Sequence, residues 1–289
     1  MPKHKPVLLH ESIEVLDLKP GEIFLDGTYG AGGHSREVIR RYPEVQVIGI
    51  DQDPAVAPAT PRLRRASKAM AGKPETGAIT RNFRDLDQVV SGKVDAILFD
   101  LGLSTDQLES SGKGFSFLKD EPLDMRMSGK GFQAAEILNS WDEPAIELIL
   151  RGFGEEKFSR NIARRIMERR KVKPFTTTFD LVEVVGKRRG KIHPATKTFQ
   201  AIRIAVNEEL TALEMGLEKG FRALRPGGRF AVISFHSLED RIVKNFFRDR
   251  AQEHSAKLIT KKPIVPSAEE IKTNPRSRSA KLRVLEKNE

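Results

Sequence analysis

A short apolar run leads into a glycine-rich loop in Glu22-Ile23-Phe24-Leu25-Asp26-Gly27-Thr28-Tyr29-Gly30-Ala31-Gly32-Gly33-His34. The apolar run predicts a buried strand that ends at Asp26. Glycines after a strand let the backbone approach a ligand closely and leave amide groups free at the start of a helix. Helical spacing continues from His34 to Arg41. This strand, loop and helix are typical of α/β proteins that hold a ligand at the turn.

Two later apolar runs also end on an aspartate. They are Val45–Asp51 and Val94–Asp100, with a short strand expected between them at Gly77–Thr80. Strands that alternate with helices predict a parallel, doubly wound α/β sheet. Ligands of such sheets bind beyond the carboxyl ends of the strands. We therefore expect these two aspartates and Asp26 to lie along the edge that binds the ligand.

The alternation of strands and helices stops in the middle of the chain. From about Leu108 to Thr211 the apolar spacing is helical, and no strand is expected there. We therefore expect residues 1–107 and 212–289 to form the α/β domain, and residues 108–211 to form an inserted all-helical domain.

After the insert the sequence predicts a return to the sheet. A long helix is expected over Phe199–Leu224, followed by a turn at Arg225–Gly228 and a strand over Arg229–Phe235. Two last strands are expected at Lys257–Val265 and Ala280–Glu286.

Positive charge is concentrated in the expected insert. The chain has 50 Lys and Arg against 40 Asp and Glu, a net charge of +10. Between Arg151 and Arg203 there are 15 basic and five acidic residues, so the rest of the chain is balanced. A localised basic surface attracts phosphate backbones, although a solvated helix face would have the same composition. We expect the insert to bind nucleic acid.

The composition also excludes several classes of site. There is no cysteine, which excludes disulfides, thiolate metal sites and cysteine nucleophiles. The histidines lack zinc-ligand spacing, so no metal site is expected. The apolar stretch before Glu11 is too short for a secretory signal, and no run approaches membrane-spanning length. We expect a cytoplasmic protein that does not bind membranes.

Two cofactor classes use a glycine loop of this kind. Dinucleotides require Gly-x-Gly-x-x-Gly, but Ser35 stands at the third glycine position after Gly30 and Gly32. S-adenosylmethionine has no phosphate and carries a sulfonium and an ammonium group, which the carboxylates of Asp26 and Asp100 would attract. The loop therefore favours S-adenosylmethionine, and an NAD(P)-dependent oxidoreductase is the alternative.

Three side chains near the loop are candidate cofactor contacts. Asp51 follows Gly30 at the separation typical of carboxylates that bind ribose hydroxyls. Phe83 follows the third strand and could pack on adenine, although an aromatic in this place is more often a core residue. His34 is either a ligand contact or an ordinary residue at the start of a helix.

Longer strings of residues resemble one family, the bacterial small-subunit rRNA cytosine-N4 methyltransferases. The strings follow one another in order over nearly the whole chain. They are His4–Leu9, Asp26–Ser35, Ile50–Pro54, Asp100–Ser104 with Gln107, Gly114–Phe117, Pro122–Met127, His193–Gln200, Ser234–Arg241 and Asn274–Ser279.

The resemblance implies a Rossmann-like, class I S-adenosylmethionine-dependent methyltransferase sheet. It also implies methylation of N4 of the decoding-centre (P-site) cytosine of 16S rRNA within the small ribosomal subunit, with no role for DNA. The implied cofactor contacts are Gly32, Gly33, His34, Asp51, Phe83, Asp100 and Gln107, the last from the resemblance alone. A non-catalytic RNA-binding protein on the same scaffold is a further alternative, which the complete loop disfavours. The oligomeric state stays open between a monomer and a homodimer.

The catalytic group is a separate question, because cytosine N4 is a poor nucleophile that needs an acceptor for its protons. Many amino-group methyltransferases place an acid or amide before Pro-Pro-aromatic, whereas Asp100 is followed by Leu101-Gly102-Leu103. Asp100 is one candidate acceptor, and a cofactor contact is its alternative role. His236, at the end of the later strand, is the second candidate, and a structural histidine is its alternative role.

Overall fold

The computed structural model describes residues 5–56, 78–186 and 193–289. The chain divides into two compact units. Unit 1 comprises Met1–Gly102 and Leu210–Glu289, and unit 2 comprises Leu103–Glu209. The junctions lie close to those expected from the sequence at residues 107 and 211.

Unit 1 is built on a mostly parallel sheet, in which the structure describes seven strands in the order β3-β2-β1-β4-β5-β7-β6. Strands β1 to β5 pair in parallel, and β7 runs antiparallel to both β5 and β6. The strand order reverses between β1 and β4, and ligands of open α/β sheets bind at such a switch point. The strands are β1 (Ile23–Asp26), β2 (Gln46–Asp51), β3 (Ala78–Thr80), β4 (Val94–Asp100), β5 (Leu224–Ser234), β6 (Ala256–Leu258) and β7 (Lys281–Lys287).

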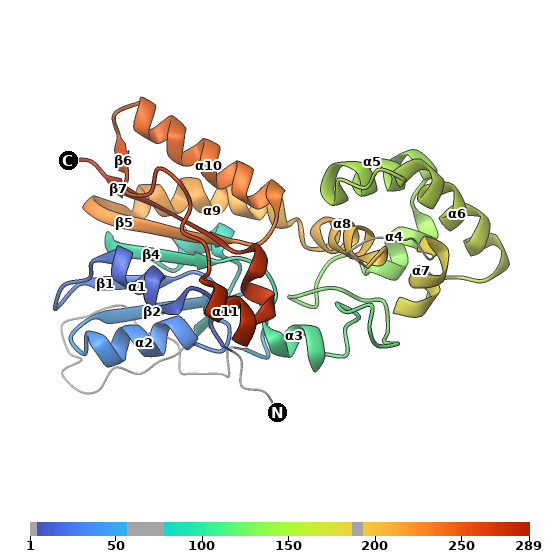
Figure 1. Cartoon of the computed structure of the whole chain (residues 1–289), viewed down its shortest axis with the longest axis horizontal. Helices are drawn as coiled ribbons and strands as arrows, with labels where there is room; N and C mark the ends of the chain where they lie inside the picture. The colour runs from blue at the N-terminus through green and yellow to red at the C-terminus, as the bar shows by residue number, and fades with distance from the viewer. Residues whose placement is uncertain (1–4, 57–77, 187–192) are drawn as a thin grey trace. The chain divides into compact units, whose positions relative to one another are not determined.

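Helices cover both faces of this sheet, as Figure 1 shows. Successive residues of β4 point to opposite faces because the side-chain period of a strand is two. Ile97 and Phe99 pack into a core with α9 and α10, whereas Ala96 and Leu98 pack into a second core with α1 and α2. The helical segments are α1 (Leu9–Leu16), α2 (Gly33–Arg41), η1 (Phe83–Gln88), α9 (Glu209–Ala223), α10 (Ser237–Gln252), α11 (Ala268–Thr273) and η2 (Pro275–Ser279).

In the described residues of unit 2, helices and the loops between them enclose a separate core. Apolar residues of its helices, such as Ile137, Ile166 and Ile202, form one fully buried cluster. The predicted fold class, an α/β sheet with an all-helical insert, is confirmed. The helices of unit 2 are α3 (Thr105–Glu109), α4 (Ala134–Ser140), α5 (Glu143–Gly154), α6 (Ser159–Val172), α7 (Thr178–Val185) and α8 (Ala195–Asn207).

The prediction of one long helix over Phe199–Leu224 is wrong. Helix α8 ends at Asn207, Glu208 has a left-handed φ of 50°, and α9 begins at the next residue. The Asn207 side chain accepts a hydrogen bond from the Met127 amide (2.9 Å) and donates one to the Met125 carbonyl (2.8 Å). These partners are distant in sequence, so local spacing contains no signal for the break.

Two predicted strand boundaries are also wrong. Residues 225–228 are a bulge within β5 and not a turn before it, because Val94 pairs with Leu224 and Ala96 with Arg229. The strand predicted at Lys257–Val265 is only the short β6, after which Ile264 forms an isolated bridge with Leu282.

No helix in the described parts of the chain combines the length and the apolar character needed to cross a bilayer.

Candidate cofactor site and active site

Asp26, the last residue of β1, has a buried carboxyl that lies at the start of the glycine loop. Its Oδ2 accepts a hydrogen bond from the Ser35 hydroxyl (2.6 Å), and its Oδ1 accepts one from the Thr28 amide (3.3 Å). Burial raises the pKa of Asp26 to about 6, and the negative charge of Asp51 adds to this shift. Ser35, which breaks the dinucleotide pattern, thus serves as the hydrogen-bond partner of Asp26.

The glycines of the loop are required by packing and by backbone conformation. A Cβ at Gly27 would overlap the Phe99 ring, and one at Gly33 would overlap Pro6. Gly32 has a φ of +71° and caps α2. Gly32 and Gly33, both predicted cofactor contacts, therefore lie where the chain enters α2, and amide groups at a helix start can face a ligand.

Asp51, at the end of β2, ties this loop to the sheet. Its Oδ2 accepts a hydrogen bond from the Gly30 amide (2.7 Å), and its Oδ1 accepts one from the Asp53 amide (2.8 Å). Burial raises its pKa. Each carboxylate oxygen can accept a further hydrogen bond. The position of Asp51 therefore permits ribose binding, which stays a prediction.

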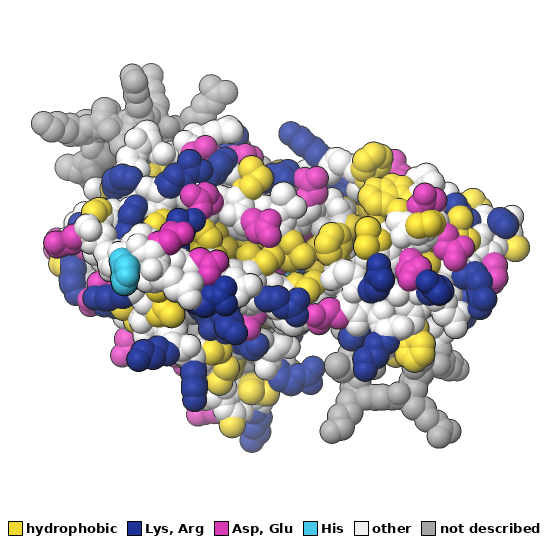
Figure 2. Space-filling model, turned by 90° about the horizontal axis from the view of Figure 1, so that it is seen from above, with side chains coloured by type: hydrophobic (Ala, Val, Ile, Leu, Met, Phe, Trp, Pro, Cys, Tyr) yellow, Lys and Arg dark blue, Asp and Glu magenta, His cyan; other side chains and the backbone are white. Residues whose placement is uncertain are grey.

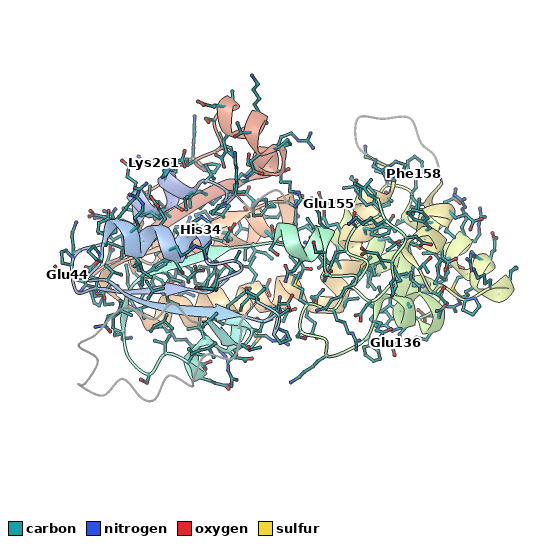
Figure 3. The ribbon with its side chains drawn as sticks, turned by 90° about the horizontal axis from the view of Figure 1, so that it is seen from below. His34, Glu44, Glu136, Glu155, Phe158 and Lys261 are labelled. Carbon is teal, nitrogen blue, oxygen red and sulfur yellow. The ribbon has the colours of Figure 1, made fainter. Side chains whose placement is uncertain are left out.

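Asp100 and His34 lie together at the switch point between β1 and β4. The Thr28 hydroxyl accepts a hydrogen bond from the Asp100 amide (2.6 Å), which joins the end of β4 to the loop. His34 is buried at the start of α2 (Figure 3), with Nε2 3.2 Å from the Val7 carbonyl and Nδ1 3.7 Å from Oδ2 of Asp100. A carbonyl only accepts, so Nε2 carries a proton and Nδ1 faces the carboxyl.

The surroundings of Asp100 suit a ligand with positive charge. Burial, together with the charges of Asp26 and Glu239, raises the pKa of Asp100 well above its ordinary value. Its Oδ1 is buried without a hydrogen-bond partner among the described residues. A buried acceptor of this kind is costly unless a ligand satisfies it. The sulfonium and ammonium groups of S-adenosylmethionine fit this acidic edge of the sheet.

His236 caps a helix, which is the structural alternative that the sequence left open. Its Nδ1 accepts a hydrogen bond from the Glu239 amide (3.4 Å), and the Glu239 carboxylate accepts from the amides of Phe235 and His236 in a capping box. Nε2 lies 3.2 Å from Oε1 of Glu239. With Nδ1 accepting, the neutral ring carries its proton on Nε2, and Nε2 is buried without a hydrogen-bond partner among the described residues. Catalysis by His236 stays a prediction.

The roles of Phe83 and Gln107 as cofactor contacts stay predictions. The Phe83 ring packs 4.7 Å from the Phe99 ring, centroid to centroid, and a Cβ at Gly216 would overlap it, so it is partly a core residue. Gln107 belongs to unit 2, where it is buried and its Oε1 accepts a hydrogen bond from the Ser104 amide (3.0 Å).

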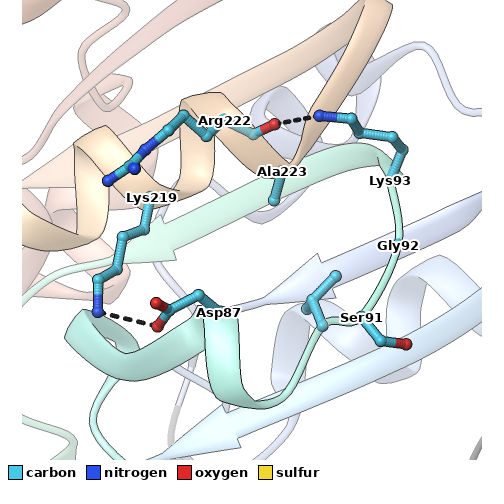
Figure 4. Close-up of a pocket in the computed structure, with 8 residues that line it drawn as sticks. Asp87, Ser91, Gly92, Lys93, Lys219, Arg222 and Ala223 are labelled. Carbon is cyan, nitrogen blue, oxygen red and sulfur yellow. Dashed lines mark hydrogen bonds and ion pairs between the residues drawn. The ribbon is translucent and has the colours of Figure 1, made fainter.

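A separate hollow of about 340 Å³ lies at the opposite end of the sheet, between the ends of η1 and α9 (Figure 4). Lys93, which directly precedes β4, donates a hydrogen bond to the Arg222 carbonyl (2.6 Å), and Lys219 pairs with Asp87 (2.8 Å). Because it opens at the amino ends of the strands, this hollow is distinct from the edge formed by Asp26, Asp51 and Asp100.

Comparison with known proteins decides between the two cofactor classes. A sequence model of the MraW methylase family matches residues 1–288. The chain belongs to the MraW methylase family. It is therefore an S-adenosylmethionine-dependent methyltransferase, and the NAD(P)-dependent alternative is wrong.

Relatives of this MraW-family chain match it over its full length. A protein of Heliobacterium modesticaldum named ribosomal RNA small subunit methyltransferase H is 44% identical, with 98% of each chain covered. A protein of the same name from Persephonella marina is 44% identical over 99% of this chain and all of the relative. A solved structure described as a putative rRNA methylase from Clostridium thermocellum has a TM-score of 0.48 at 13% identity, with 98% of each chain covered.

Three polar residues of the MraW-family site escaped the sequence reasoning. The Thr28 hydroxyl accepts from the Asp100 amide, the Ser35 hydroxyl donates to the Asp26 carboxyl, and Glu239 adds to the negative field at Asp100. A signal existed for Glu239, because an acid three residues after a helix cap is typical of a capping box. For Ser35 the only signal was the absence of the third glycine.

Replacement of Asp26 by Asn is expected to stabilise the ligand-free MraW-family protein above pH 6. The folded pKa of about 6 exceeds the ordinary value of 3.8, so the fold favours the protonated form and loses stability as the pH rises between these values. The shift corresponds to roughly 3 kcal/mol. Asn has no charge to bury, and its carbonyl can still accept from Ser35.

Urea unfolding at pH 4.5 and pH 7.5 measures this effect. We expect a smaller loss of unfolding free energy with pH in Asp26→Asn than in the wild type. Asp249→Asn is the control, because Asp249 is exposed and pairs only with neighbouring charges such as Arg248. An unchanged pH dependence in Asp26→Asn would refute the assignment.

Proposed function

We propose that this chain transfers a methyl group to N4 of the decoding-centre (P-site) cytosine of 16S rRNA, with S-adenosylmethionine as donor. The names of its curated relatives support a small-subunit rRNA substrate. The observation that carries the chemistry is Asp100, a carboxyl at the sheet's switch point with one oxygen buried and unsatisfied among the described residues.

The bound donor supplies an electrophilic methyl group on a positively charged sulfur. The N4 lone pair is conjugated into the ring, so the amine becomes a better nucleophile when an acceptor draws on its hydrogens. We assign this acceptor role to Oδ1 of Asp100. As the new nitrogen–carbon bond forms and the sulfur–carbon bond breaks, the amine proton passes to this oxygen. A positive ligand charge beside Asp100 favours the carboxylate form that the transfer requires.

His34 then has a positioning role. Its Nε2 proton is held by the Val7 carbonyl, which fixes the ring so that Nδ1 faces Oδ2 of Asp100. Oδ1 of Asp100 then remains to accept a hydrogen bond from the substrate amine. The target base must leave its stack to reach this oxygen, and RNA loops permit that at low cost.

Unit 2 supplies part of the RNA-binding surface in this proposal. Of the 15 basic residues between Arg151 and Arg203, Lys187, Arg188, Arg189 and Lys191 lie outside the described residues. Four more are held internally: Arg169 pairs with Asp180, Arg203 pairs with Glu209, and Arg170 and Lys197 donate to main-chain carbonyls. Seven are exposed, namely Arg151, Lys157, Arg160, Arg164, Arg165, Lys171 and Lys173. The available cationic surface is therefore smaller than the composition alone indicates.

Charge reversal of Arg164 and Arg165 to Glu is expected to weaken RNA binding by about tenfold or more at 0.1 M salt, and less at higher salt. Fluorescence anisotropy with a labelled 16S fragment over a salt series measures this. Lys244→Glu with Arg248→Glu is the control, because it makes the same charge change on exposed residues of α10. An equal loss of affinity at low and high salt would count against this surface.

The function itself is tested with small ribosomal subunits from a strain that lacks this activity. The protein is incubated with methyl-labelled S-adenosylmethionine and either these subunits or bare 16S rRNA, and the labelled nucleotide is then mapped. We expect one labelled cytosine, methylated on its exocyclic amine, in the decoding centre. Label on another base, or on a ring carbon, would show the proposal to be wrong.

A further inference from the structure

The segment Asn274–Ser279 is a part of the sequence that the proposed function does not yet use. It forms the end of α11 and the short helix η2. Ser277, fully buried, donates through its hydroxyl to the Asn274 carbonyl (2.8 Å), and the Ala280 amide donates to the Ser277 carbonyl (2.7 Å). The backbone of this segment is thus held in a defined conformation.

One end of the segment is tied to the chain's beginning, beside the cofactor loop. The Asn274 side chain donates to the Lys5 carbonyl (3.2 Å), and the Glu270 carboxylate accepts from the Leu8 amide (2.9 Å). Between these two anchors lies Val7, whose carbonyl meets Nε2 of His34. Through these contacts the segment is connected to the residues that shape the site.

The other end of the segment enters β7 at the same edge of the sheet. Lys281 pairs with Ser234, the last residue of β5, after which the chain turns to His236. Because β5 runs parallel to β4, the carboxyl ends of both strands lie at this edge. Figure 1 shows α11, in red, on the side of the sheet where β7 begins. The segment therefore borders the edge that carries Asp100.

This segment carries exposed arginines, and the neighbouring cations of β7 form ion pairs. Lys281 and Arg283 pair with Asp240 (2.9 and 2.7 Å). Arg276 and Arg278 are both exposed, and Arg278 has no ion pair or hydrogen bond among the described residues. On the face shown in Figure 2, Lys and Arg side chains occur over both units and are not confined to the insert.

We propose that Arg276 and Arg278 bind phosphate groups of the RNA next to the nucleotide that is methylated. The inference rests on the proposed function, because it takes RNA as the substrate. The site contains three carboxyls, Asp26, Asp100 and Glu239, which repel a phosphate backbone when they are ionised, as the proposed proton transfer requires of Asp100. Cations at the rim of the site offset that repulsion. Guanidinium groups bind phosphate in a bidentate manner, and an ordered backbone reduces the entropy lost on binding.

The test compares Arg276→Gln, Arg278→Gln and the double variant with the wild type. Affinity for a labelled 16S decoding-region fragment is measured by fluorescence anisotropy from 0.05 to 0.3 M salt. We expect the double variant to bind roughly tenfold more weakly at 0.1 M salt, with a shallower dependence of log K on log salt by about 0.7 per lost phosphate contact. The double variant to Lys is expected to recover part of the affinity, because the charges remain.

Two controls distinguish a failure of this inference from a failure of the proposed function. Affinity for S-adenosylmethionine, measured by calorimetry, should be unchanged in all variants, which shows that the fold and cofactor site are intact. Arg248→Gln, an exposed residue about eleven positions into α10, should bind RNA like the wild type. If the wild type binds and methylates the RNA while the double variant matches its affinity and salt dependence, this inference is wrong. If the wild type itself fails to bind or methylate RNA, the proposed function is wrong.

Discussion

Asp100→Asn is expected to slow methyl transfer by about two to four orders of magnitude, the range that a positioned proton acceptor contributes. The amide keeps the shape of the carboxyl and can still accept a hydrogen bond, but it cannot take the amine proton near neutral pH. Loss of the negative charge should also weaken binding of the cationic donor, because Asp100 shares the acidic edge with Asp26 and Glu239.

Single-turnover rates at saturating S-adenosylmethionine separate these two effects. The rate constant reports on proton acceptance, and the cofactor affinity is measured independently by calorimetry. Asp249→Asn should behave like the wild type, since Asp249 lies twelve residues beyond the start of α10, roughly 18 Å along the helix. A rate for Asp100→Asn within threefold of the wild type would exclude Asp100 as the acceptor and leave it only a cofactor contact.

Gly27→Ala is expected to cause the largest loss of stability, about 3 kcal/mol. A Cβ at this position would overlap the Phe99 ring. That ring is fully buried and packs against Phe83 (4.7 Å) and Phe230 (5.0 Å, centroid to centroid), so it has little room to move. Forcing extra atoms into a packed core costs roughly 1–3 kcal/mol and occasionally more. The displacement should also disturb the loop and weaken cofactor binding.

A second substitution tests the cause. Phe99→Leu frees space beside Gly27, so the double variant Gly27→Ala with Phe99→Leu should lose at least about 1 kcal/mol less than the sum of the single variants. Urea unfolding provides the free energies. Gly92→Ala is the control, because a Cβ there would meet no atom within 4 Å. Strict additivity of the two changes would show that the overlap does not cause the loss.

The sheet and the edge that carries the site follow from the sequence alone. The apolar runs that end at Asp26, Asp51 and Asp100 are β1, β2 and β4 of the structure. The sequence indicates these features because burial imposes a period of two on strands. The loop is indicated by its glycines, which allow backbone conformations that other residues disfavour. The helical character of the insert follows in the same way from its apolar spacing.

The roles of the polar side chains depend on contacts that form only in the folded chain. Local spacing could not show that Ser35 donates to Asp26 or that Arg169 is held by Asp180. The same is true of the break at Glu208, next to Asn207, whose side chain exchanges hydrogen bonds with residues 80 and 82 positions away. The charge of a polar group and its availability to a ligand depend on its burial and on partners that are distant in the chain. Neither can be read from the residues next to it.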